Sequence, residues 1–185
     1  MKRISICAIA IVAALAAPPA QAQQMGAAPA RAAQPGSIQS ELADDVGTMA
    51  DKFVALAGAM AGKYDWRPGT GVRSVAEVFN LIVGENRMLA GLLTGMPAQG
   101  GGMGGGANQI SDPKAMQEAL RSSYAALKQA IAGLSDADLK ASVRMFGQNT
   151  TKQGAALMLV TDQHEHLGQS IAYARTNSVV PPWSK

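Results

Sequence analysis

The segment from Asp162 to Tyr173 contains the residues of this chain that are best suited to chemistry. Both histidines of the protein, His164 and His166, lie in it. Residues four apart on an α-helix share a face, whereas residues two apart diverge by about 200°, twice the ~100° step per residue. Asp162 and His166 can therefore hold one metal ion or one proton together, whereas His164 and His166 cannot.

One face of this predicted helix is polar where apolar residues are expected. The residues at helical spacing are Leu159, Asp162, His166, Gln169 and Tyr173. Polar groups that face a protein interior are costly unless they bond one another, water or a metal ion. Two interpretations follow, a metal site that includes Asp162 and His166, or a polar network in which His166 bonds a carboxylate or Asn86. In either case, the residues expected around the pair are Asn86, His164, Glu165 and Gln169, with an exposed position as the alternative for His164.

Four amphipathic helices are predicted from apolar residues that recur at spacings of three and four. The later predicted helices are each preceded by a side chain that is typical of a helix start. Such a side chain accepts a hydrogen bond from a backbone amide that has no partner within the helix. The predicted helices begin near Ser37, Ser74, Asp112 and Thr150 or Thr151, and the last ends near Thr176. No convincing strand is found. The sequence therefore predicts an all-α fold, a four-helix bundle over residues 37–176.

The N-terminal residues 1–22 are typical of a secretory signal peptide. Lys2 and Arg3 precede an apolar run, and a cleavage pattern of small residues ends at Ala22. The apolar run is shorter than the ~20 residues that span a bilayer, so a membrane anchor is the less favoured alternative. We expect a secreted or periplasmic protein, cleaved near Ala22, with no stable membrane anchor.

Three further segments flank or interrupt the predicted bundle. Residues 23–36 have the composition of a flexible linker, and residues 177–185 form a tail expected to pack on the bundle. Residues 99–107 are glycine-rich but lack the strand, lysine and hydroxyl residue of a phosphate-binding loop. The only cysteine, Cys7, lies in the signal peptide, so the mature chain has no disulfide and no thiolate ligand.

Composition and motifs exclude several classes of function. A chain of 185 residues with 48% hydrophobic residues can bury one core, and we expect one domain. No basic surface with interleaved aromatic residues is visible, so no nucleic-acid partner is expected. No nucleophile elbow accompanies the histidines, which argues against a Ser-His-Asp hydrolase. Asp162 and Glu165 lack the aromatic cleft of a glycosidase.

Four segments of the chain carry a resemblance to a known family. They are Trp66–Pro68, Arg73–Phe79 with Gly84 and Asn86, His164–Arg175 and Pro181–Ser184. They resemble the DinB/YfiT-like superfamily, and more narrowly its exported, uncharacterised DinB-family members, over about Ser37 to Lys185. The resemblance implies a four-helix bundle, often dimeric, with a divalent ion held by one histidine of the second helix and an H-x-x-x-H pair on the last. Some relatives are transferases or isomerases that use low-molecular-weight thiols.

Carried over to this sequence, the three metal-binding positions of the family fall on Leu81, Asp162 and His166. Only His166 keeps the usual identity, so a three-histidine site does not form. Asp162 remains as an oxygen ligand, which shifts the preference from zinc toward harder ions such as magnesium or manganese. Additional oxygen donors are offered by Asn80, Glu85 and Asn86.

The sequence leads to two hypotheses. The leading hypothesis is an exported DinB-like protein with a degenerate metal site and a binding or interaction role toward an unknown small molecule or protein. The alternative is a divalent-metal-dependent transferase or hydrolase that uses Asp162 and His166. Both hypotheses leave a homodimer open.

Overall fold

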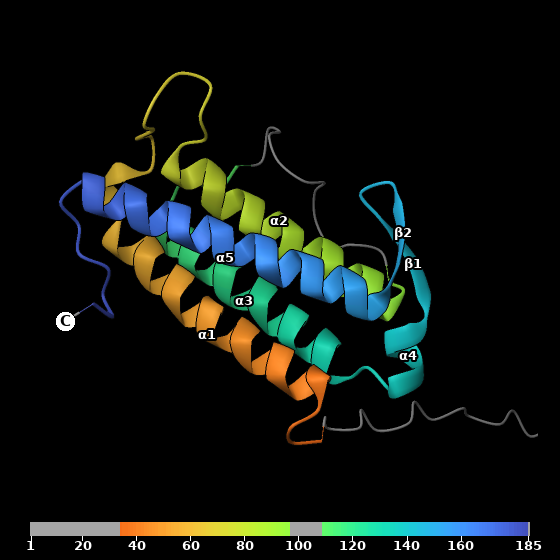
Figure 1. Cartoon of the computed structure of the whole chain (residues 1–185). Coiled ribbons are helices and arrows are strands. Elements are labelled where there is room, and N and C mark those ends of the chain that lie inside the picture. The colour runs from red at the N-terminus through yellow and green to blue at the C-terminus, as the bar shows by residue number, and fades with distance from the viewer. Residues whose placement is uncertain (1–33, 97–108, 185) are drawn as a thin grey trace, which may run out of the picture.

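Helices make up most of the computed structural model, which describes residues 34–96 and 109–184 (Figure 1). Within these ranges the chain forms five α-helices, one short 3₁₀ helix and one two-stranded hairpin. The α-helices are α1 (Ile38–Ala59), α2 (Val75–Thr94), α3 (Pro113–Ala132), α4 (Asp136–Lys140) and α5 (Lys152–Thr176), and the 3₁₀ helix is η1 (Ala61–Lys63). The prediction of a mostly helical fold is confirmed.

Side-chain caps begin the four long helices where the sequence predicts them. Ser37, Asp112 and Thr151 each accept a hydrogen bond from a backbone amide of the first turn. Ser74 and Glu77 form the predicted capping box, in which each side chain accepts a hydrogen bond from the backbone amide of the other residue. These caps satisfy amides that have no partner within the helix.

The four long helices enclose one apolar core. Helices α1 and α2 each pack against both α3 and α5. At the centre of the core, the ring of Phe53 stacks on Tyr124 with centroids 6.0 Å apart and meets Phe79 edge to face at 6.3 Å. The packing of α2 against α5 brings side chains of α2 to the polar face of α5.

The expectation of a fold without strands was wrong. Residues Ser142–Met145 (β1) and Gln148–Thr151 (β2) form an antiparallel hairpin, which lies with α4 at one end of the long helices (Figure 1). The two turn residues, Phe146 and Gly147, have φ values of 49° and 80°. Positive φ at both positions characterises the type I′ turn, which usually contains Asn-Gly or Asp-Gly. The hairpin was not predicted from the sequence, because phenylalanine is unusual at this turn position and the two strands are short and polar.

Several predicted segments lie outside the described residues. They are the signal peptide at 1–22, most of the linker at 23–36 and the glycine-rich loop at 99–107. At the other end of the chain, Val179 and Trp183 are partly buried against the core, and Lys52 Nζ lies 5.9 Å from the centroid of the Trp183 ring. Of the helices that the structure describes, none is both long enough and apolar enough to cross a bilayer.

Candidate metal centre

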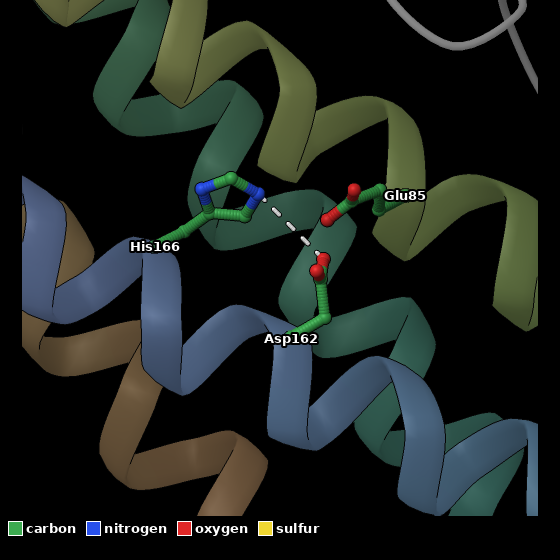
Figure 2. Close-up of side chains that lie close together, drawn as sticks. All are labelled: Glu85, Asp162 and His166. Carbon is green, nitrogen blue, oxygen red and sulfur yellow. Dashed lines mark ion pairs between the residues drawn. The ribbon is translucent and has the colours of Figure 1, made fainter.

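Three side chains with metal-binding atoms meet between α2 and α5 (Figure 2). Glu85 lies on α2, and Asp162 and His166 lie one turn apart on α5. One ligand atom from each residue lies within 4.8 Å of the other two. His166 Nε2 is 3.6 Å from Asp162 Oδ2, and the Glu85 carboxyl group points toward the same carboxylate. We call these three residues the metal cluster.

The metal cluster lines a cleft of about 870 Å³. The walls of the cleft come from α2, α5, the connection before α2 and the turn of the hairpin. Other side chains that line it include Arg67, Val72, Arg73, Leu81, Phe146 and Met158. This volume lies within the range of small-molecule sites in proteins, roughly 300–1,000 Å³.

Glu85 has an environment that fits a cation. Its residue is only 4% exposed, and its Oε2 atom has no hydrogen-bond partner in the described part of the chain. Burial, and then the negative charge of Asp162, raises the pKa of Glu85 to about 8, against the opposing charge of Arg73. The metal-free carboxyl group is therefore largely protonated at neutral pH. A divalent cation fits this pair of carboxyl groups, because it would replace the proton and satisfy the orphaned oxygen.

A chain of hydrogen bonds holds the imidazole of His166. Its Nδ1 atom lies 2.9 Å from Gln169 Oε1. Gln169 Nε2 donates to the Tyr173 hydroxyl at 2.8 Å, and this hydroxyl donates to the Arg73 carbonyl oxygen at 3.1 Å. Because Gln169 Oε1 can only accept, the neutral imidazole carries its proton on Nδ1. Its Nε2 lone pair is therefore directed to the metal cluster, as a metal ligand requires.

A family model for the DinB superfamily matches residues 48–170, which is more than half of the chain. The chain belongs to the DinB superfamily. The matched residues include Glu85, Asp162 and His166, so the metal cluster lies within the part that the superfamily shares. A comparison with curated proteins finds no match.

Leu81 occupies the position at which the DinB resemblance places a histidine on the second helix. It lines the cleft one helical turn before Glu85. Of the three oxygen donors considered from the sequence, only Glu85 joins the pair on α5. Asn80 instead bonds both the amide and the carbonyl of Ile110. In the sequence, the one feature that could have identified Glu85 as a candidate ligand was its four-residue spacing from Leu81.

Asn86 belongs to a separate buried network. Its Nδ2 atom donates to Ser123 Oγ at 3.2 Å, and its Oδ1 atom accepts from Gln163 Nε2 at 2.6 Å. All three residues are buried. Consecutive residues on a helix diverge by about 100°, so Asn86 faces the interior while Glu85 faces the cleft. His166 does not bond Asn86, because Asn86 bonds Ser123 and Gln163.

His164 and Glu165 lie away from the metal cluster. Both residues are on the exposed side of α5. His164 Nε2 lies 2.8 Å from Oδ2 of Asp45 on α1, so this histidine forms a hydrogen bond at the protein surface. Of the residues expected around the pair on α5, only Gln169 contacts a member of the metal cluster.

Proposed function

We propose that this protein is a DinB-like four-helix bundle that binds one divalent metal ion through Glu85, Asp162 and His166. The observation that supports the proposal is the meeting of three ligand atoms within 4.8 Å in a cleft of small-molecule size. The hypothesis of a degenerate site assumed two ligands. Glu85 offers a third ligand from another helix, so a complete three-residue site is available.

The ligand types bear on which ion is bound. Two carboxylates favour harder ions such as manganese and magnesium, whereas imidazole suits zinc and other transition metals. We therefore expect manganese and zinc to be the ions that compete for this site. With three protein ligands, a bound ion would have further coordination positions available for a substrate or water, as in catalytic metal sites.

The proposed activity is that of a divalent-metal-dependent transferase or hydrolase. A bound divalent ion supplies Lewis-acid activation of a water or thiol in the cleft. Gln169 would keep His166 Nε2 directed at a bound ion, and Glu85 would release its proton to solvent on metal binding. Leu81 and Met158 cover part of the cleft wall with apolar groups. Export of the protein is also proposed, on the signal-peptide pattern of residues 1–22 alone.

Metal titration of the full chain, purified without a histidine tag, tests the proposal. We expect one bound ion per chain by elemental analysis and isothermal titration calorimetry. Glu85→Gln, Asp162→Asn and His166→Ala should each lower the affinity by about a hundredfold or more, because each removes a direct ligand.

Matched controls come from the same helix. Glu165→Gln and His164→Ala remove similar groups from the exposed side of α5 and should leave the affinity unchanged. The proposal is wrong if the wild-type protein binds no divalent ion, or if these controls lose as much affinity as the variants of the metal cluster.

A further inference from the structure

The cleft has a second set of side chains beyond the metal cluster. Arg67 and Arg73 come from the connection that precedes α2, Phe146 comes from the hairpin turn, and Met158 comes from α5. Positive and apolar groups therefore face the same cavity. Neither group is needed to hold a metal ion, so their presence in the cleft requires a separate explanation.

Arg67 is already engaged by the protein. Its guanidinium lies 3.4 Å from Glu77 Oε2 and donates to the Val72 carbonyl oxygen at 3.2 Å. Arg73, by contrast, is exposed and has no ion-pair partner within 4.0 Å among the described residues. Arg73 lines the same cleft as Glu85, Asp162 and His166. Arg73 therefore presents an unused guanidinium to the cleft.

Phe146 places its ring at the cleft in an unfavourable backbone conformation. The residue is 51% exposed and has a φ of 49°. Bulky residues are rare in this left-handed region, and asparagine is usual at this position of the turn. Met158 is also 42% exposed and lines the same cleft. Two exposed apolar side chains on one cleft are a contact surface for an apolar group.

We propose that the cleft binds a small organic anion with an apolar body. Its anionic group, a carboxylate or a phosphate, pairs with the guanidinium of Arg73, which offers two parallel donors to either group. Its apolar body packs against Phe146 and Met158. The inference rests on the proposed function, since the same cleft contains the metal cluster, but it depends on residues that are not metal ligands.

Calorimetric titration of the full chain with chosen probes tests the inference. The probes are octanoate and octyl phosphate, which have both features, acetate, which lacks the apolar body, and octan-1-ol and octylamine, which lack the negative charge. We expect an eight-carbon anion to bind at least about tenfold more tightly than acetate, octan-1-ol or octylamine. The stronger of the two anions identifies the anionic group as a carboxylate or a phosphate.

Two variants test the residues. Arg73→Gln should weaken binding of the preferred anion by about tenfold or more, whereas Arg121→Gln should not, because Arg121 is an exposed arginine of α3 outside this cleft. Phe146→Asn should weaken anion binding and at the same time raise the melting temperature, because asparagine accepts the left-handed conformation. A loss of binding through misfolding would instead lower the melting temperature.

Metal titrations of the same proteins separate this inference from the proposed function. Phe146→Asn should keep the metal affinity of the wild type, and Arg73→Gln should not lower it, because the Arg73 charge repels a cation and is not a ligand to it. If no metal binds but the anions bind through Arg73, the proposed function fails and this inference stands. The inference is overturned if Arg73→Gln binds the anion as the wild type does, if octan-1-ol binds as tightly, or if no probe binds at up to about 10 mM.

Discussion

Leu81 and Glu85 lie one helical turn apart on α2, and both side chains line the cleft that contains Asp162 and His166. The position that the DinB resemblance assigns to a histidine is thus occupied by an apolar residue, and a carboxylate one turn further along reaches the pair on α5. Positions 81 and 85 lie on the same face of α2, because they are four residues apart. If the three residues bind an ion as proposed, the third ligand lies one turn further along α2 than the resemblance implies, and it is an oxygen instead of a nitrogen.

Leu81→His should increase the affinity for zinc by about tenfold or more, because it adds an imidazole on the face that carries Glu85. The change should leave the fold intact. Leu81 is only 7% exposed, but it faces the cleft and is not a member of the main core cluster. Calorimetric titration with zinc measures the effect. Leu81→Asn is the control for polarity, and an equal zinc affinity in the two variants would contradict the assignment of this position.

The raised pKa of Glu85 predicts that the metal-free protein loses stability as the pH rises. The carboxyl group has its ordinary pKa of 4.5 in the unfolded chain and a pKa of about 8 in the folded protein. Between these values the folded state binds more protons than the unfolded state, so the free energy of unfolding falls with pH. The fall in the free energy of unfolding levels off above pH 8. It amounts to at most a few kcal/mol, on the order of one kcal/mol per pKa unit.

Urea unfolding in a chelator, from about pH 5 to pH 9, measures this effect. Glu85→Gln cannot ionise, so its stability should depend much less on pH, and it should exceed the wild type in stability at pH 8. Glu165→Gln removes an exposed carboxylate from α5 and should keep the slope of the wild type. Equal slopes for the wild type and Glu85→Gln would show that Glu85 does not titrate in this window.

Gln169→Leu should lower the metal affinity by about ten- to a hundredfold, because Nδ1 of His166 loses the acceptor that fixes its proton. Gln169→Glu keeps an acceptor oxygen at the same position and should retain most of the affinity. Nitrogen NMR of the metal-free protein reports the tautomer directly. We expect the Nδ1-protonated form in the wild type and a mixture of tautomers in Gln169→Leu. A lower affinity with an unchanged tautomer would assign Gln169 a packing role instead.

Asn86→Ala should destabilise the protein by roughly 1–3 kcal/mol, because it leaves the buried Nε2 atom of Gln163 without its acceptor. Urea unfolding at one pH measures the loss. Asn149→Ala changes the same residue type at an exposed position of β2 and should have little effect. Metal stoichiometry should not change, since Asn86 faces away from the cleft. A stability equal to that of the wild type would show that the buried network contributes nothing net.

Features that depend on nearby residues were predictable from the sequence. The caps at Ser74 and Asp112 were recognisable because a cap is formed within one turn of the chain. The approach of Asp162 and His166 followed from their spacing on one helix. Both predictions needed no knowledge of how the helices pack.

Features that depend on packing between distant segments were not fixed by the sequence. Glu85 was one of three candidate oxygen donors, and only the packing of α2 against α5 distinguishes it from Asn80 and Asn86. The relay from Gln169 to the carbonyl of Arg73 likewise depends on how the connection before α2 meets the end of α5. Helical spacing specifies the face of a residue but not its neighbour across the interface.

The β1–β2 hairpin satisfies its own backbone pairing, and only its turn reaches the cleft. Its two turn positions are therefore separated from the residues that hold the helices together and from those of the metal cluster. One wall of the cleft can therefore be redesigned by itself. This can be done by replacing Phe146 and Gly147 with a library of other dipeptides, or by grafting a longer turn between β1 and β2. If the cleft binds an anion as proposed, its selectivity can be engineered, or altered in evolution, without changing the helices beneath it.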